Sequence, residues 1–201
     1  MDLPFSPACE RNREPILAVL REHLAKPARV LEIGGGTGQH AAFFAAHLPQ
    51  LHWQSSDRAD YLQGLAARIR HAALPNLPAP LELDVARREL WPTESFDAAY
   101  SANTLHIMGW PEVEQFFALV DSVLGAESML IVYGPFNYGG RFTSESNAAF
   151  DAQLRADDPK RGIRDFEAVD ALARAQGFVL SEDIAMPANN RSLVWTRCRG
   201  A

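Results

Sequence analysis

The chain has 201 residues, of which 47% are hydrophobic and 22% charged, and its formal charge is -6 at pH 7. These values are ordinary for a globular protein, and residues 1–201 are expected to form one domain with a sizeable core. The acidic balance argues against nucleic acid as the main partner. No stretch of about 18 apolar residues runs without charge, so we expect no membrane association.

The two cysteines, Cys9 and Cys198, lie near opposite ends of the chain and lack the spacing of metal ligands. The first residues, Met1 to Pro7, lack the charged and apolar regions of a secretory leader. The chain is therefore expected to be cytoplasmic and to hold no metal.

A first helix is expected over residues 6–25, because Ser6 can cap it, Pro7 can occupy its first turn, and apolar side chains recur on one face. Pro15 is expected to kink this helix or to split it in two. Two roles remain open. The helix covers an edge of the sheet, or its polar residues 10–13 fold over a bound cofactor as a lid, with Asn12 touching the substrate.

A glycine-rich stretch follows this helix. Residues 29–33 are mostly apolar and β-branched, four glycines occur within residues 34–38, and a helical pattern continues over residues 41–48. The order strand, tight loop, helix is typical of the opening unit of a doubly wound α/β sheet. Such a loop lies at the carboxyl end of its strand, where these sheets bind ligands, and glycine lets its backbone approach them closely.

The spacing G-x-G-x-G at Gly34, Gly36 and Gly38 puts Gln39 where a dinucleotide fingerprint has its last glycine, so the match to NAD is poor. Glu32 adds a negative charge at the loop mouth, which suits a ligand with an ammonium group and no phosphate, such as S-adenosylmethionine. The stretch resembles motif I of the Rossmann-like class I methyltransferases, E-x-G-x-G-x-G. The resemblance implies that these five residues bind the cofactor and that the acid faces its amino group. A glycine-rich turn in an unrelated α/β protein is the alternative.

A second acid follows the second strand, which is expected at residues 51–55. Asp57 lies where Rossmann-type sheets place the acid that accepts from the ribose hydroxyls. Its alternative role is to cap the helix expected at residues 59–73, although Asp60 could do so instead.

A third acid ends the short third strand, which is expected at residues 81–83. In the methyltransferase pattern Asp84 receives the adenine amino group, and the backbone nitrogen of Val85 meets the ring. Capping of a turn before Arg87 is the alternative for this acid.

The fourth strand, residues 96–101, leads into a polar turn beside the first strand. Because this turn leaves the carboxyl end of the strand, its side chains should face the cleft. Ser101 and Asn103 are candidate cofactor ligands. His106 is the first candidate for a general base or a substrate-binding group, and a purely structural histidine is the alternative.

A fifth strand is expected at residues 129–133 after a helix that begins at Pro111, and Tyr133 is the second candidate base. Residues 134–165 form an insertion on the acceptor side. Its long polar and aromatic loop is typical of a lid or binding wall, with a solvated crossover as the alternative. The candidates for substrate binding in it are Phe136, Asn137, Tyr138 and Arg141.

The remaining chain is expected to form a helix over residues 166–176 and an antiparallel closing pair at residues 178–184 and 193–197. Asn189 lies at the turn between the two strands and is a further candidate for substrate binding.

Several segments carry a second resemblance, which spans nearly the whole chain: residues 6–12, 39–40, 83–85, 133–136, 147–151, 162–165 and 186–190. They look like the methyltransferase-like 26 family, catalogued as a domain of unknown function. The resemblance implies an α/β fold, a Rossmann-like three-layer α/β/α sandwich with a seven-stranded, mostly parallel sheet of order 3-2-1-4-5-7-6, strand 7 being antiparallel. It implies S-adenosylmethionine as cofactor, with S-adenosylhomocysteine as product, and does not supply the acceptor.

The favoured function is methyl transfer from S-adenosylmethionine to an unidentified acceptor. The protein need only align that acceptor and remove any proton it carries. No Asn-Pro-Pro-Tyr-like run follows the fourth strand and neither cysteine suits a covalent nucleophile, which leaves a small molecule as the leading acceptor class. One alternative is a noncatalytic module that binds S-adenosylmethionine and reports it to a protein partner. Another is a nicotinamide-dependent oxidoreductase, which the absent third glycine disfavours.

Overall fold

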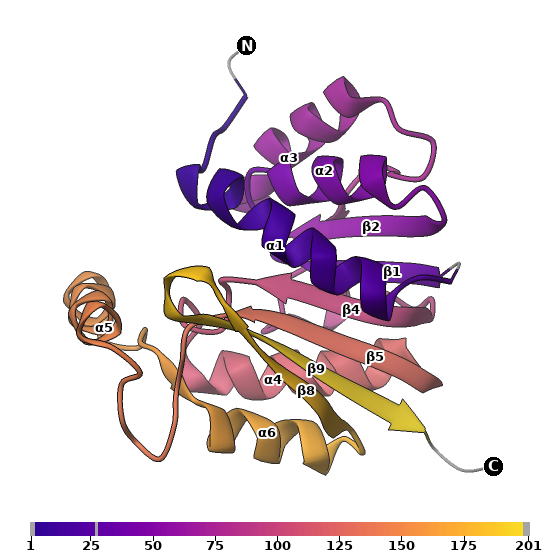
Figure 1. Cartoon of the computed structure of the whole chain (residues 1–201). Helices are drawn as coiled ribbons and strands as arrows, with labels where there is room; N and C mark the ends of the chain where they lie inside the picture. Colours follow the sequence, from indigo (N-terminus) through magenta and orange to yellow (C-terminus); the bar gives the residue numbers. More distant parts are fainter. Residues whose placement is uncertain (1–2, 27, 199–201) are drawn as a thin grey trace.

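A seven-stranded mixed sheet runs through the computed structural model, which describes residues 3–26 and 28–198 (Figure 1). Its order is β3-β2-β1-β4-β5-β9-β8, and the pairs among the first five strands are parallel. β9 is antiparallel to both β5 and β8. The strands are β1 Ala28–Ile33, β2 Leu51–Asp57, β3 Leu81–Glu82, β4 Phe96–Ala102, β5 Leu124–Gly134, β8 Val179–Met186 and β9 Asn190–Cys198.

This topology confirms the predicted fold class. β8 and β9 are the sixth and seventh strands of this sheet along the chain, so its order in those terms is 3-2-1-4-5-7-6. The seventh strand is the antiparallel one, as expected. The carboxyl ends of the five parallel strands therefore meet at one edge, where ligands bind in open α/β sheets.

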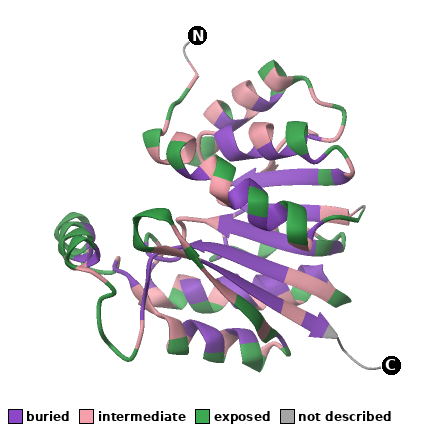
Figure 2. Cartoon of the chain, viewed as in Figure 1, coloured by how far each residue is buried: buried purple, intermediate pink, exposed green. Residues whose placement is uncertain are grey.

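Helices cover both faces of the sheet (Figure 1). Successive side chains of a strand point to opposite faces, so Val30 shares a core with α1, α2 and α3 while Leu31 shares another with α4 and α6. The central strands are largely buried between these layers, whereas β8, at one end of the sheet, has no buried residue (Figure 2). None of the helices within the described residues is long and apolar enough to cross a membrane. The helices are α1 Pro7–His23, α2 Gln39–His47, α3 Ala59–Ala72, α4 Trp110–Val123, α5 Glu145–Asp157 and α6 Phe166–Ala175, with short 3-10 turns at Arg88–Leu90 and Pro187–Asn189.

Helix α1 lies over the central strands, not at an edge of the sheet. Its residues Ile16, Leu17 and Leu20 are buried in the same core as Val30 of β1 and Tyr100 of β4. The Ser6 hydroxyl accepts a hydrogen bond from the N–H of Cys9 at 3.5 Å, and so caps the helix as predicted. Pro15 does not split the helix, because one helix runs through this residue, which leaves a kink as the remaining prediction.

A separate two-stranded parallel sheet, which the sequence did not predict, lies within the acceptor-side insertion. β6 Phe136–Asn137 follows β5 directly and pairs with β7 Arg164–Asp165. The two strands bracket α5, which projects from the rest of the molecule in Figure 1. This pairing fixes the end of the insertion next to the carboxyl end of β5.

Candidate cofactor and acceptor site

The glycine loop between β1 and α2 is shaped by left-handed backbone. The φ angles of Gly34, Gly36 and Gly38 are +82°, +54° and +73°, a region that side chains other than glycine rarely adopt. A Cβ at Gly34 would lie 2.4 Å from Cγ2 of Thr104, whereas a Cβ at Gly36 would meet nothing within 4 Å. Gly34 thus permits contact with the loop after β4, and Gly36 borders open space.

Asp57, at the end of β2, braces this loop. Its Oδ2 accepts a hydrogen bond from the N–H of Gly36 at 2.7 Å, and its Oδ1 accepts from the N–H of Arg58 at 2.7 Å. Burial raises the pKa of this carboxyl, although the two backbone donors oppose the rise. Asp57 is not the helix cap, since Arg58 holds that position. Each carboxylate oxygen has a second lone pair for a further donor, such as a sugar hydroxyl.

Glu32 lies beneath the glycine loop rather than at an open mouth. It is 2% exposed, and its Oε2 accepts hydrogen bonds from Oγ of Ser55 and, at 3.2 Å, from Nε1 of Trp53. Burial, followed by the smaller effect of the charge on Asp57, raises the pKa of Glu32 to about 7. The carboxyl is therefore only partly ionised near neutral pH, and a cationic ligand beside it would favour the ionised form.

Asp84 forms the turn before Arg87, which is its alternative role. Its Oδ1 accepts from the N–H of Ala86 at 3.0 Å, and its carbonyl accepts from the N–H of Arg87 at 3.0 Å. The next residue, Val85, is buried. A polar cavity of about 280 Å³ adjoins this turn, and its lining includes Asp84, Arg58 and Arg87. The carboxyl ends of β2 and β3 thus border a space with both donors and acceptors.

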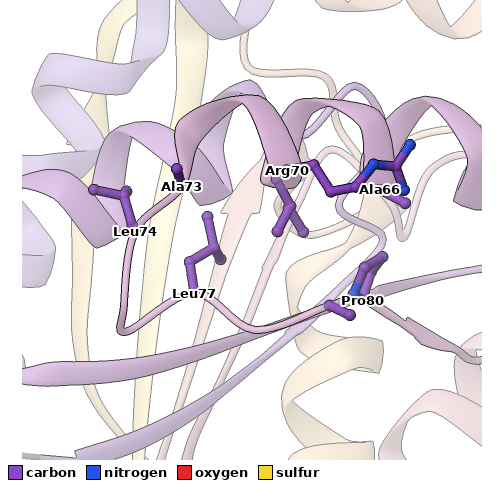
Figure 3. Close-up of a pocket in the computed structure, with 8 residues that line it drawn as sticks. Ala66, Arg70, Ala73, Leu74, Leu77 and Pro80 are labelled. Atoms are coloured by element: carbon purple, nitrogen blue, oxygen red, sulfur yellow. The ribbon is translucent and has the colours of Figure 1, made fainter.

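A second cavity, of about 290 Å³, is mostly apolar and lies between α3 and the segment that leads to β3 (Figure 3). Its lining includes Ala66, Leu74, Leu77 and Pro80. None of the predicted site residues lines it.

Ser101 and Asn103 hold the loop after β4 in place. The buried hydroxyl of Ser101 donates to the carbonyl of Ile33 at 2.7 Å and bonds with Oγ1 of Thr104 at 2.6 Å. Asn103 has a φ of +57°, and its N–H donates to the carbonyl of Tyr133 at 2.8 Å. These bonds tie the ends of β1, β4 and β5 together.

His106 lies where the ends of β4 and β5 meet. A Cβ on Gly134 would lie 3.7 Å from Nδ1 of His106 and 3.9 Å from Oδ1 of Asn103, and the ring of Phe150 packs edge-on against the imidazole at 5.4 Å. Burial and, secondarily, the charge of Arg164 lower the pKa of His106 to about 4. The imidazole is therefore neutral near pH 7. Among the described residues, neither of its ring nitrogens has a hydrogen-bond partner.

Tyr133 belongs to a different polar group, under α1. Burial raises the pKa of its phenol, and hydrogen bonds with the side chains of Asn12 and Asn190 oppose the rise. Oδ1 of Asn12 lies 2.7 Å from Nε2 of His40. Burial lowers the pKa of His40 to about 4, so this ring is also neutral. Sequence reasoning gave His40 no role, although its place directly after Gln39 was a usable indication.

Gln39 connects the glycine loop to the start of α1. Its Oε1 accepts from the N–H of Ser6 at 2.5 Å and from Oγ1 of Thr37 at 3.0 Å, while its Nε2 donates to Oε1 of Glu10 at 2.8 Å. The polar start of α1 therefore contacts the loop directly, as a lid over this site would.

The residues predicted to bind the substrate do not gather in one place. Tyr138 donates its hydroxyl to Oδ2 of Asp183 at 2.8 Å and stacks on the ring of Phe166, away from the glycine loop. Arg141 is exposed, and its backbone pairs with that of Tyr138. Asn189 is exposed and bonds to the start of α5 through Ser146.

Two further residues predicted to bind the substrate are buried directly after β5. Phe136 lies in the core, and the side-chain oxygen of Asn137 has no hydrogen-bond partner among the described residues. Among all the residues that the structure describes, no group of three or more His, Cys, Asp or Glu side chains is arranged to hold a metal ion.

Residues 3–197 match the model of a protein family whose description is "Protein of unknown function (DUF938)". The chain belongs to this family. The fold of this DUF938 protein is also found in solved structures. It is similar to an O-methyltransferase family protein from Burkholderia thailandensis, with a TM-score of 0.82 and 16% identity over 94% of this chain and 57% of that chain.

Two other solved structures are similar to this DUF938 protein. The S-adenosylmethionine-dependent methyltransferase SibL, in its apo form, matches with a TM-score of 0.79 and 20% identity over 95% of this chain and 56% of that chain. The mitomycin 7-O-methyltransferase MmcR matches with a TM-score of 0.74 and 16% identity over 90% of this chain and 54% of that chain. This chain thus spans little more than half the length of these proteins, with which it shares a Rossmann-like methyltransferase fold.

Proposed function

We propose that this DUF938 protein transfers a methyl group from S-adenosylmethionine to a hydroxyl group of a small molecule. The observation that carries the proposal is the bond between Asp57 and the N–H of Gly36, because it sets a carboxylate able to accept from ribose hydroxyls beside the glycine loop. The fold supports it, since solved structures that share it are named as methyltransferases. The segments that resemble the methyltransferase-like 26 family support the finer assignment to that group.

The residues present fit S-adenosylmethionine. Open space at Gly36 leaves room for the ligand, both oxygens of Asp57 can accept from ribose hydroxyls, and Asp84 can accept from the adenine amino group. Glu32 beneath the loop can stabilise the ammonium group. When bound, this cofactor supplies a methyl group that its positively charged sulfur already activates.

The acceptor side favours a hydroxylated molecule with an apolar body. His106 is neutral at pH 7, so its imidazole is free to accept a proton from a hydroxyl group, although its pKa of about 4 makes it a weaker base than an ordinary histidine. Phe150 packs on the ring of His106, and Ile107 follows His106 in the sequence. Each of these two apolar side chains is 41% exposed. This apolar rim beside the base suits an aromatic or aliphatic ring.

Calorimetry and a turnover screen test the proposal. We expect heat from S-adenosylmethionine and S-adenosylhomocysteine but not from NAD, and product formation from phenols or alcohols before thiols, amines or carboxylates. His106→Gln should keep the cofactor affinity and lose roughly 10²- to 10⁴-fold in rate, whereas the exposed His52→Gln should retain both. Heat from NAD alone would end the proposal. Binding without turnover would favour the noncatalytic module with a protein partner.

A further inference from the structure

The loop that carries His106 is bonded on its outer side to the short segment that follows α5. Nε of Arg164 donates to the carbonyl of Leu105 at 3.0 Å, and its Nη2 donates to the carbonyl of Met108. The N–H of Gly162 donates to the carbonyl of His106 itself at 3.0 Å. The segment of Gly162 and Arg164 thus binds three carbonyl groups of this loop: those of Leu105 and Met108, on either side of the candidate base, and that of His106 itself.

Arg164 is itself held in place by the small second sheet. It lies in β7 and pairs with Phe136 of β6, two residues after Gly134, against which the imidazole packs. Its Nη2 also donates to the carbonyl of Lys160 at 3.0 Å. A guanidinium group is planar, with several donors in fixed directions, so one such side chain can hold several carbonyl groups in a defined arrangement.

We propose that Arg164 is a positioning residue that holds His106 in place for proton removal from the acceptor. The role of His106 as base rests on the proposed function, but the bonds from Arg164 and its effect on the imidazole can be measured without any substrate. Arg164 thereby gives residues 134–165 a defined role, because the last residues of this insertion set the geometry of the loop after β4.

The charge of Arg164 also acts on the imidazole. Phe150 of α5, Asn103 of the same loop and Gly134 of β5 surround the ring without charge, so Arg164 of β7 is the charged group that disfavours the imidazolium form. Arg164 in turn interacts with Arg155 and Asp151 of α5 and with Glu112 of α4. Replacing Arg164 by a neutral side chain of similar length should therefore raise the pKa of His106, whereas replacing it by lysine keeps the charge and removes only the planar fork that holds the loop.

Proton NMR of the His106 ring over a pH titration tests the proposal in the full chain. In Arg164→Gln we expect the titration midpoint of His106 to move to higher pH, because the opposing charge is gone while burial still keeps it below the ordinary value. Arg164→Lys keeps the charge but not the fork, so it should keep most of the low midpoint while the loop signals broaden. The control Arg21→Gln, on the exposed side of α1, should change neither.

Sharp, unshifted signals of the His106 loop in folded Arg164→Lys would overturn the proposal, as would an unchanged His106 midpoint in folded Arg164→Gln. If that variant does not fold, hydrogen exchange of the unmodified protein decides, because the Gly162 amide must be protected by its bond to the His106 carbonyl, and rapid exchange there would contradict the arrangement. Calorimetry with S-adenosylmethionine on the same samples distinguishes failure of the proposed function from failure of the proposal on Arg164. Loss of the cofactor heat in the unmodified protein would refute the proposed function and leave the result on Arg164 intact.

Discussion

The carboxylate of Asp57 accepts a hydrogen bond of 2.7 Å from the backbone N–H of Gly36, so the acid that ends β2 shapes the loop that follows β1. The residue proposed to bind the ribose therefore also fixes the conformation of the loop around it. Binding and local stability are coupled in this one side chain.

Replacing Asp57 by alanine is expected to weaken S-adenosylmethionine binding on the order of 10- to 100-fold, because hydrogen bonds to a charged group contribute about 1.5–3 kcal/mol. The same change leaves the N–H of Gly36 without its partner, so the melting temperature should fall as well. Calorimetry and thermal unfolding measure the two effects. The exposed Glu114→Ala on α4 should change neither, and equal affinities in both variants would contradict the ribose role.

Gly34→Ala is expected to destabilise the protein by about 2–4 kcal/mol, because it combines a clash with backbone strain. The new Cβ would lie 2.4 Å from Cγ2 of Thr104, at a φ of +82°. Urea unfolding measures the loss. Gly125→Ala is the matched control, since a Cβ there meets nothing within 4 Å. Thr104→Ser removes the clashing methyl group and should recover part of the loss in the double variant; no recovery would mean that strain alone acts.

The protonation of Glu32 predicts a pH-dependent stability. Its pKa is about 7 in the folded protein, against an ordinary value of 4.5. Between these values the folded protein keeps a proton that the unfolded chain has released, so the free energy of unfolding falls as the pH rises through this window. Glu32→Gln should remove a decline on the order of 3 kcal/mol between pH 4 and pH 8. Urea unfolding at several pH values measures it, and parallel curves for the two proteins would contradict it.

The same carboxyl predicts proton release on cofactor binding. A ligand ammonium group near Glu32 favours its ionised form, so binding at pH 6 should expel a proton and strengthen as the pH rises toward 7. Calorimetry in two buffers of different ionisation enthalpy detects the released proton as a difference in heat. Glu32→Gln should show no such difference. An equal difference in both proteins would place the proton elsewhere.

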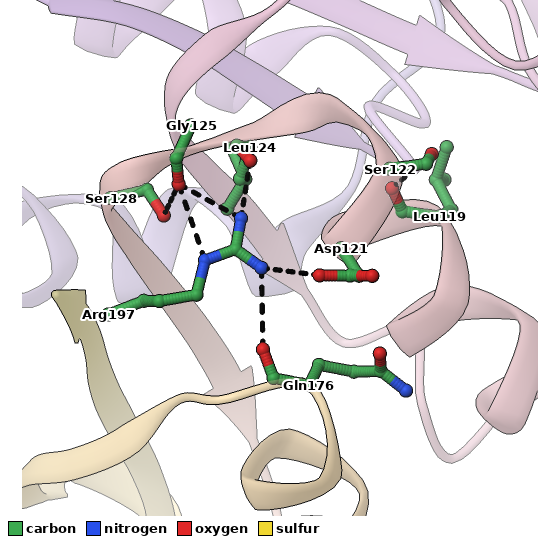
Figure 4. Close-up of polar contacts among 8 residues, drawn as sticks. All are labelled: Leu119, Asp121, Ser122, Leu124, Gly125, Ser128, Gln176 and Arg197. Carbon is green, nitrogen blue, oxygen red and sulfur yellow. Dashed lines mark hydrogen bonds and ion pairs between the residues drawn. The ribbon is translucent and has the colours of Figure 1, made fainter. Parts of the chain in front are cut away.

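Arg197 predicts a large effect on stability, far from the proposed site. It is 1% exposed, and it donates to Oδ1 of Asp121 at 2.6 Å and to the carbonyl groups of Leu124, Gly125 and Gln176 (Figure 4). These bonds join the ends of α4 and α6 to β9. Arg197→Met leaves these carbonyl groups without their donor, and because each buried group left unsatisfied costs about 1–3 kcal/mol, we expect a loss on the order of 3–5 kcal/mol.

Urea unfolding measures this loss, and the matched control is Arg29→Met. Arg29 pairs with Glu94 on the surface, where the two side chains are 43% and 47% exposed, so its removal should cost less than about 1 kcal/mol. Folded Arg197→Met should bind S-adenosylmethionine normally, because β9 runs antiparallel and its end lies at the opposite edge of the sheet from the glycine loop. Similar losses in the two variants would contradict a structural role for Arg197.

The main sheet could be predicted because its strands carry local signals. The apolar run over residues 29–33 and the glycines after it specify a strand and its loop, and together with the family resemblance they led to the observed order. β6 and β7 could not be predicted, since two-residue strands have no periodicity and their pairing joins Phe136 to Arg164 across α5. β5 begins at Leu124, before the predicted residue 129, because Leu124 pairs with Phe96 of β4 and the polar Glu127 and Ser128 pair with β9.

The candidate site, like the sheet, could be predicted from the sequence only in part. The positions of Asp57 and Asp84 after their strands follow from local patterns, and the structure places them at one edge of the sheet. The burial of Glu32 could not be predicted, because residue type indicates only a charge, and the raised pKa comes from burial, which the hydrogen bonds from Ser55 and Trp53 oppose. The contact of His40 with Asn12 was missed for a similar reason, since 28 residues separate them along the chain.

The indole of Trp53 gives the protein a built-in optical reporter. It is fully buried, and its Nε1–H is bonded to the carboxyl group that lies under the glycine loop. Any event that changes the ionisation of this carboxyl changes the electric field at the indole, and with it the wavelength of its emission. Fluorescence of a variant that keeps only this tryptophan would therefore follow ligand binding without a label.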